Sequence, residues 1–255
     1  MRKLRVLVGY EFLQCFVSPF FYAICSLFIL LTGLIFFFSL KVYADFSQDE
    51  PFIQTLFKCF WLPSLLIVPV LTTRSIASER SSQRLDSMLA LHMNPLWIVL
   101  SKFITIYSIY MGLWIVCCAF PWMAQRLCPG LRPFANILVD SQTLYGGLLY
   151  LFLVNGLVIA FGLFCSSVAK YPITAIVSTA VGIFIFLISG QLFKYLSVAS
   201  LEHGEFFGTA YGEWNTFFHL EDFCRCIIDT RVVVGYGSLT CAFLLLAALT
   251  LHHRS

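Results

Sequence analysis

The sequence predicts an all-α integral membrane protein, and three observations lead to that fold class. Of the 255 residues, 60% are hydrophobic and only 11% are charged, and the mean hydropathy is +0.87. A soluble domain instead carries about 25% charged and about 45–50% apolar residues. Six apolar segments approach the length of roughly 20 residues that an α-helix needs to cross about 30 Å of hydrocarbon. The first is too long for a removable signal peptide, so we expect the chain to insert uncut.

An N-terminal amphipathic helix is predicted before the first span. Its apolar residues share one face, and its basic residues and Gln14 fall off that face, which is typical of a helix lying in the headgroup plane. The apolar residues are Leu4, Leu7, Val8, Phe12, Cys15 and Phe16, and the basic ones are Arg2, Lys3 and Arg5. Pro19 should close this helix and begin the first span. A simple basic anchor is the alternative interpretation.

The spans belong to one domain that covers residues 1–255. Pro63 and Pro69 should kink the second span and require it to pack against other helices. In the fourth span, Gly156, Ala160 and Gly162 give a small-residue face for close packing within the subunit or against a second copy. A short re-entrant or interfacial piece is expected in the loop 194–231. The predicted spans are 20–40, 56–71, 96–120, 144–166, 173–193 and 232–251.

The distribution of charge predicts that both termini lie in the cytoplasm. With six spans, the side of the termini holds nine Lys/Arg and three acids, and the far side holds seven Lys/Arg and ten acids. The basic excess lies in short loops, which determine orientation. The net charge of +3 is explained by attraction to the anionic cytoplasmic leaflet. Nucleic-acid binding is not expected, because no basic run with interleaved aromatics occurs outside the spans.

Neither an enzyme nor a cofactor site is predicted. Catalytic sequence motifs are lacking, and the spans hold almost no ionisable groups apart from Lys58 and Lys102 near their ends. The segment HLEDFCRC at 219–226 could be read as a metal cluster. It lacks the C-x-x-C spacing of a closed zinc site, so an amphipathic loop helix is the preferred interpretation. Most of the other cysteines lie in or beside apolar spans, where a thiol behaves as a small hydrophobe.

Mild polar groups inside the spans allow two interpretations. Asn155, Thr174, Ser178 and Gln191 lie in the predicted fourth and fifth spans. Hydrogen bonds between helices are the simpler explanation. The alternative is a substrate path along these residues.

The segment 72–103 carries an unusual concentration of charge for this chain. On a helix of about 100° per residue, Arg80 and Arg84 form a basic stripe, Leu85 and Leu89 an apolar one, and Glu79 with Asp86 an acidic one. Like charges four residues apart disfavour an isolated helix. An acidic surface is therefore expected outside the helix, either phosphate headgroups or a carboxylate-lined groove on a partner. A solvated interfacial helix resting on lipid is the plain alternative.

The same segment resembles the signature of ABC-2 type permeases. VPVLTTRSIASERSSQRLDSMLALHMNPLWIVLSK matches it without an insertion from Pro69 to Lys102. Further blocks agree: GYEFLQCFVSP at the N-terminus, with Glu11 in step, GLFCSSVAKYPITA after the fourth span, and the last loop and span. The match is closest to the gliding-motility and nitrous-oxide-accessory branch. Gln83 and Arg84 stand where this family has Gly-Thr, and Cys226 stands where it has glycine.

The resemblance implies an architecture and a function. It implies six spans in the bacterial cytoplasmic membrane, a two-fold dimer formed with an identical or a related permease, and a separate cytoplasmic ATPase bound to each subunit. A coupling helix between spans two and three would contact that ATPase through Arg74, Glu79, Arg80, Arg84 and Asp86. The chain would use ATP hydrolysis by its partner for export or for transmission of motion. Independently of the resemblance, the few charged groups in the spans favour a lipidic or amphipathic cargo over a small ion. A non-transporting scaffold that recruits a cytoplasmic protein is the alternative.

Overall fold

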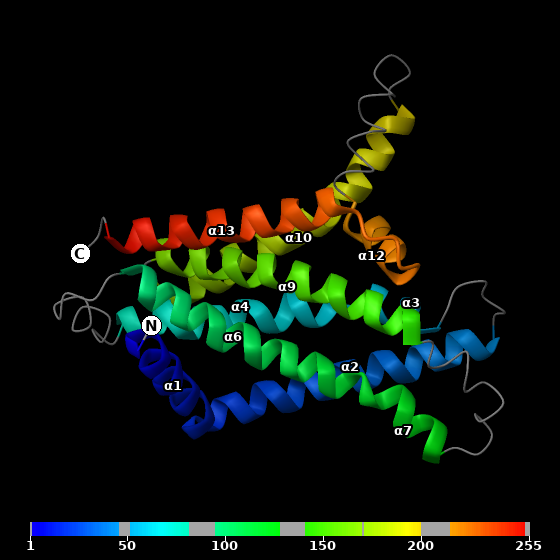
Figure 1. Cartoon of the computed structure of the whole chain (residues 1–255), viewed down its shortest axis with the longest axis horizontal. Coiled ribbons are helices and arrows are strands. Elements are labelled where there is room, and N and C mark those ends of the chain that lie inside the picture. The colour runs from blue at the N-terminus through cyan, green and yellow to red at the C-terminus, as the bar shows by residue number, and fades with distance from the viewer. Residues whose placement is uncertain are drawn as a thin grey trace.

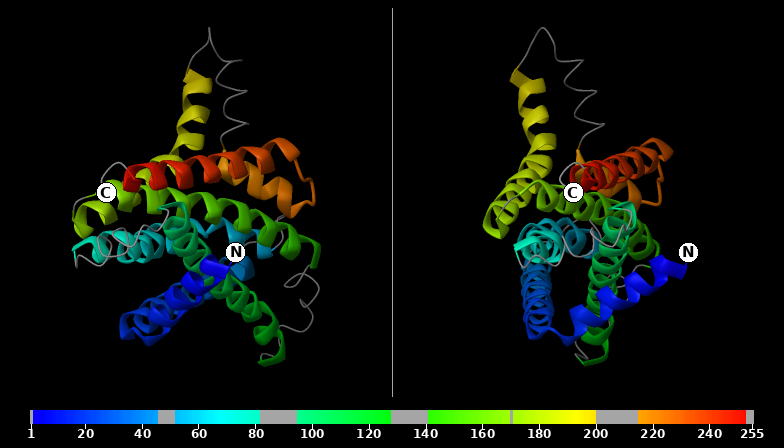
Figure 2. Two further views of the ribbon diagram at one scale, coloured as in Figure 1. Left: turned by 60° about the vertical axis from the view of Figure 1, so that its left-hand side comes forward. Right: turned by 90° about the vertical axis from the view of Figure 1, so that its left-hand side faces the viewer.

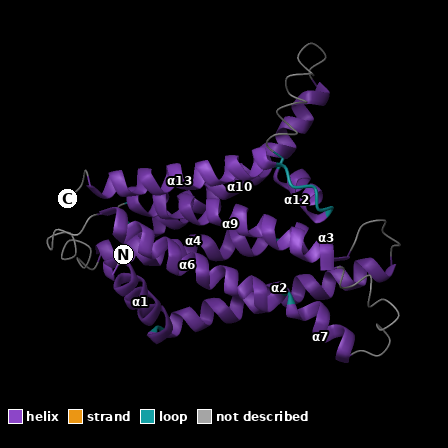
Figure 3. Ribbon diagram, viewed as in Figure 1, coloured by secondary structure: helices purple, strands orange, loops and turns teal. Residues whose placement is uncertain are grey.

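In the computed structural model, every regular element among the described residues is an α-helix (Figure 3). The structure describes residues 2–45, 52–81, 95–127, 141–169, 171–199 and 215–252. The helices are α1 (Arg2–Val17), α2 (Pro19–Asp45), α3 (Phe52–Lys58), α4 (Trp61–Ser81), α6 (Pro95–Cys117), α7 (Ala119–Leu127), α9 (Ser141–Val168), α10 (Pro172–Ala199), α12 (Thr216–Cys224) and α13 (Thr230–His252).

The long helices run back and forth along the long axis of the molecule (Figure 1). α2, α6 and α10 run away from the end that holds both chain termini, and α4, α9 and α13 return to it. We call this the terminal end, and we call the opposite end, where α3 and α12 lie, the α12 end. The predicted placement of both termini on one side of the bundle agrees with this arrangement.

Five helices in the described ranges are long and apolar enough to cross a membrane. They are Pro19–Lys41, Pro95–Met123, Gln142–Val168, Pro172–Ser189 and Thr230–His252. The predicted second span is divided between α3 and the first part of α4, which meet at a bend of 40° and pass the same test only together. Five of the six predicted spans therefore coincide with helical segments that are long and apolar enough to cross a membrane, and the sixth coincides with a bent pair.

The bend in the second apolar segment lies just before Pro63. α3 ends at Lys58, Cys59 and Phe60 form a turn, and α4 begins at Trp61. Pro63 thus occupies the first turn of α4, where a missing N–H costs no helical hydrogen bond. Pro69 lies inside α4, and the Thr73 hydroxyl donates to the Pro69 carbonyl at 2.6 Å. The expected kink is present, and it takes the form of a break in the helix.

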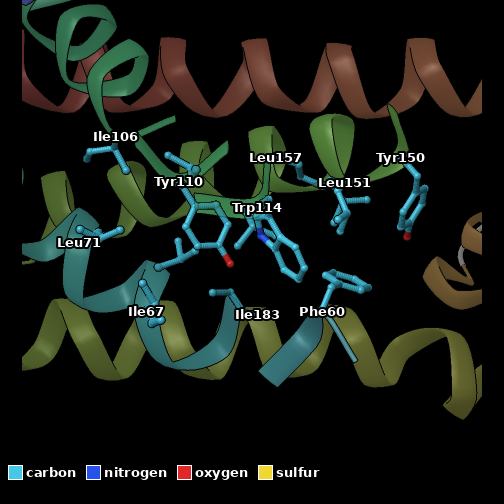
Figure 4. Close-up of a cluster of buried hydrophobic side chains, with 14 of the residues drawn as sticks. Phe60, Ile67, Leu71, Ile106, Tyr110, Trp114, Tyr150, Leu151, Leu157 and Ile183 are labelled. Carbon is cyan, nitrogen blue, oxygen red and sulfur yellow. The ribbon is translucent and has the colours of Figure 1, made fainter. Parts of the chain in front are cut away.

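α9 is the central helix of the bundle. It packs against α13, α4, α12, α10, α6 and α3, and Tyr150, Leu151 and Leu157 contribute to the core in Figure 4. A Cβ atom on Gly162 would lie 2.8 Å from the Thr72 side chain of α4, and Ala160 is fully buried. The small-residue face of this helix therefore supports close packing within the subunit.

α1 crosses the bundle axis at the terminal end (Figure 2, right). It stops at Val17, and α2 begins at Pro19, so the proline separates the two helices as predicted. Ser18 bridges them: its N–H donates to the Cys15 carbonyl, and its own carbonyl accepts from the Phe21 N–H. α1 packs chiefly against α6 and touches α2 less.

Candidate functional site

The predicted coupling residues lie at or beyond the terminal end of α4. Arg74, Glu79 and Arg80 belong to the last turns of α4, where the structure describes the backbone alone. Arg84 and Asp86 lie outside the described residues, which resume at Pro95 with α6. Residues 74–81 thus continue the span as one helix, and they form the first part of the predicted coupling segment.

A buried ion pair joins α1 to α6 close to this segment. Lys102 Nζ donates to Glu11 Oε1 at 2.8 Å, and the exposed fractions of the two side chains are 0% and 8%. Lys102 lies seven residues after the start of α6 at Pro95, which corresponds to about 10 Å along the helix axis. Taking two charges out of water is costly, so such a pair is retained where each charge compensates the other.

α1 presents two different faces as a result. Leu7 and Glu11 are buried on the side that contacts the bundle. The opposite side carries an exposed apolar stripe with helical spacing, which we call the α1 stripe; it consists of Val6 (72% exposed), Tyr10 (50%), Leu13 (65%) and Val17 (74%). Phe16, predicted to share a face with Leu7, is 51% exposed. The packed side of α1 thus holds a carboxylate beside Leu7, with Leu4, Val8 and Phe12 half-buried around it, and the exposed side carries the α1 stripe.

Sequence reasoning named Lys102 and Glu11 separately and missed their contact. Their separation of 91 residues gives no local pattern that could join them. The sequence could nevertheless have indicated the contact, because a lysine inside an apolar span needs an acidic or polar partner. Glu11 is the only acid among the first 40 residues, and it stood in the block that resembles the permease family.

Asn155 belongs to a polar cluster in the centre of the bundle. The Ser64 hydroxyl of α4 lies 3.0 Å from the Tyr110 hydroxyl of α6 and donates to Asn155 Oδ1 of α9 at 3.4 Å. All three residues are fully buried, and Figure 4 shows the Tyr110 oxygen directed toward α4. The geometry fits the simpler of the two interpretations, because these hydrogen bonds connect three helices inside the core.

The other residues of the predicted substrate path lie on α10, away from this cluster. Thr174 and Ser178 are exposed, and their hydroxyls donate within α10 to the carbonyls of Tyr171 and Ala175 at 2.7 and 3.1 Å. Gln191 lies in the part of α10 whose backbone alone is described. Asn155 is therefore buried in the core, whereas Thr174 and Ser178 lie on the exposed surface of α10.

At the α12 end, short helices cover the start of α9. Asn215 caps α12 by accepting the N–H groups of Phe217 and Phe218, and the Tyr150 hydroxyl of α9 donates to the Thr216 carbonyl. Lys58 of α3 pairs with Glu221 of α12 at 2.8 Å, with exposed fractions of 26% and 30%. The loop 194–231 thus contains the expected short helix. In the described ranges, no three His, Cys, Asp or Glu side chains gather in a geometry that could hold a metal ion.

The two cysteines at the end of α12 differ in accessibility, which gives a labelling prediction. Cys224 is 4% exposed, whereas Cys226 is exposed. Burial raises the pKa of the Cys224 thiol to about 12, against a smaller lowering by the Lys58 ammonium. The thiolate is the reactive form, so at pH 7.5 a membrane-impermeant maleimide should modify Cys226 and leave Cys224 unmodified. Mass spectrometry of the labelled peptide tests this, and equal labelling of both residues would contradict it.

Cys226 also has a backbone conformation that favours glycine. Its φ is 60°, the only positive value among the described non-glycine residues, and the resembling family has glycine at this position. A left-handed conformation costs an L-residue roughly 1–2 kcal/mol. Cys226→Gly is therefore expected to raise the free energy of unfolding by about 1 kcal/mol, measured by denaturant titration in detergent. The control Cys241→Gly, inside the helix α13, should lower it by a similar amount.

Comparison with known proteins adds no family assignment to this geometry. No protein-family model and no curated protein matches the chain.

Proposed function

We propose that this chain is the membrane subunit of an ATP-driven transporter of the ABC-2 type, acting as an exporter or as a transmitter of motion. One observation carries the proposal: residues 69–102 resemble the permease signature without an insertion. In the fold this segment leaves α4 and enters α6 at the end that holds both termini. A partner on that side of the membrane would therefore meet the charged segment directly.

The proposed assembly has six spans per subunit, with α3 and α4 counted as one bent span. Both termini lie in the cytoplasm of a bacterial cell, and two permease copies form the dimer. Large apolar side chains are exposed along α2, α10 and α13. Both lipid tails and the apolar helices of a second copy can pack against such surfaces. The ATPase is a separate cytoplasmic subunit, and the permease contributes no catalytic residue of its own.

Coupling proceeds through helices that are continuous with the signature segment. The ATPase grips residues 74–92, and ATP-driven closure displaces the adjoining ends of α4 and α6. α4 packs against α9 and α10, and the close approach of Thr72 to Gly162 leaves little room for slip between α4 and α9. A displacement of α4 therefore moves the centre of the bundle, as close packing transmits strain.

Charge reversal in the coupling segment tests the proposal. Glu79→Arg with Arg80→Glu should weaken binding of the cognate ATPase by roughly thirtyfold or more, because mispaired interfacial charges cost about 2–5 kcal/mol. Co-purification and ATP hydrolysis in reconstituted vesicles are the measurements. The control reverses the pair at the α12 end, Lys58→Glu with Glu221→Lys, and should leave both unchanged.

Two other results would reject the proposal. Binding of a cytoplasmic protein that does not hydrolyse ATP would favour the scaffold function. Crosslinks from residues 76–90 that reach only lipid would remove the basis for any partner at this segment.

A further inference from the structure

The Glu11–Lys102 pair lies near the start of α6, so a displacement of the coupling segment would reach this pair soon after it reaches α6. α6 starts directly after that segment, and Lys102 follows within about two turns. The pair joins α6 to the middle of α1 within a longer contact between these two helices. At the other end of α1, the chain turns at Ser18 into α2.

Because α1 is attached at these two points, a movement of α6 would rotate α1 about its junction with α2, as a lever rotates about its pivot. Ser18 and Pro19 interrupt the helix and provide a pivot, because proline ends the hydrogen-bonding pattern of α1 before α2 begins. Glu11 lies two turns from that pivot and is clamped to α6. The N-terminal half of α1, on the other side of Glu11 from this pivot, has Leu7 buried and Val6 and Tyr10 exposed.

A buried ion pair strengthens the mechanical link between two packed helices. Close packing already transmits displacement, and separating two buried opposite charges would in addition leave both without compensation. The pair is enclosed, with Lys102 fully buried and Glu11 nearly so. By contrast, the Lys58–Glu221 pair at the α12 end has the same distance but is about one quarter exposed, so water can replace either partner.

We propose that Glu11 and Lys102 are positioning residues that make α1 move with α6, so that each ATPase cycle shifts the α1 stripe within the inner leaflet. This inference rests on the proposed function. The stripe is exposed and apolar, and Arg5 beside it is exposed as well. That combination fits the boundary between acyl chains and anionic headgroups.

The test uses the complex of permease and ATPase in nanodiscs of phosphatidylethanolamine and phosphatidylglycerol. A solvatochromic amino acid incorporated at Tyr10 reports the surroundings of the α1 stripe without interference from the native cysteines. With the natural pair, trapping the ATPase with ADP and vanadate should shift the emission. With Glu11→Met and Lys102→Met together, we expect this shift to be lost while the complex still forms and hydrolyses ATP. The matched control, Lys58→Met with Glu221→Met, should keep the shift.

A reversed pair separates positioning from simple stabilisation. Glu11→Lys with Lys102→Glu restores attraction with opposite polarity and should recover the emission shift. A folded reversed pair without the shift would overturn the proposal, as would a shift that persists in the neutral double variant. If both double variants fail to fold, the pair only holds the bundle together, and the proposal is likewise rejected.

The outcomes also distinguish this inference from the proposed function. Failure of the natural chain to bind or stimulate an ATPase rejects the proposed function itself. If the complex hydrolyses ATP normally but the probe at Tyr10 shows no emission shift, the proposed function still holds. Only the proposal that α1 moves with α6 is then rejected.

Discussion

Lys102→Met is expected to lower the free energy of unfolding by about 3–5 kcal/mol, because it leaves the Glu11 carboxylate buried without a counter-charge. Methionine has nearly the length of the lysine stem, so little packing is lost and the effect reports the charge. Glu11 is 6% exposed, which leaves little water to compensate it. The measurement is denaturant titration in detergent micelles, followed by intrinsic tryptophan fluorescence.

Two further variants isolate the electrostatic origin of this effect. Glu11→Met combined with Lys102→Met should recover most of the loss, since replacing both partners of a buried pair by apolar groups is often near neutral. Lys58→Met breaks the more exposed pair with Glu221 and should cost only about 0–1 kcal/mol. A Lys102→Met protein as stable as the Lys58→Met protein would show that the buried pair does not hold α1 to α6.

The helices themselves could be predicted because they depend on local features. Apolar length located the five helical segments that are long enough to cross a membrane, and Pro19 marked the boundary between α1 and α2. The two prolines of the second span correctly indicated a kink. Their positions could not show that the break would fall at Cys59 and Phe60, before Pro63, because that choice depends on how α3 packs against α9 and α12.

Helix pairing in the membrane could not be predicted in the same way. Lipid is as apolar as leucine, so an apolar face does not mark the side of a helix that packs. α1 shows both outcomes: Leu13 and Val17 are exposed, whereas the predicted apolar face, with Leu7 buried and Leu4, Val8 and Phe12 half-buried, lies on the packed side beside Glu11. Small residues were a better guide, since Gly162 does receive a neighbouring helix.

The candidate site was predictable to a similar, limited extent. The charged segment that we propose for coupling is visible in the sequence because its stripes are local. The ion pair beside it joins residues from two distant segments, and only tertiary structure brings them together. The polar cluster of Ser64, Tyr110 and Asn155 depends on three helices in the same way.

The start of α9 gives the second large expected effect, which concerns steric fit. Gly146→Ala should lower the free energy of unfolding by about 1–3 kcal/mol or more, as overpacking does in a close-packed core. A Cβ atom at Gly146 would overlap the carbonyl oxygen of Phe223 in α12. Backbone cannot rotate away as a side chain can, so α12 must move as a unit. Thermal denaturation in detergent measures the loss.

A second readout shows whether α12 is the element that moves. Cys224 is 4% exposed and lies one residue after Phe223, so a displaced α12 should open its thiol to maleimide. Gly112→Ala in α6 is the matched control, because a Cβ there meets no atom within 4 Å; it should stabilise the helix by about 0.5–1 kcal/mol and leave Cys224 protected. If Gly146→Ala behaved like this control, the close seating of α12 on α9 would be wrong.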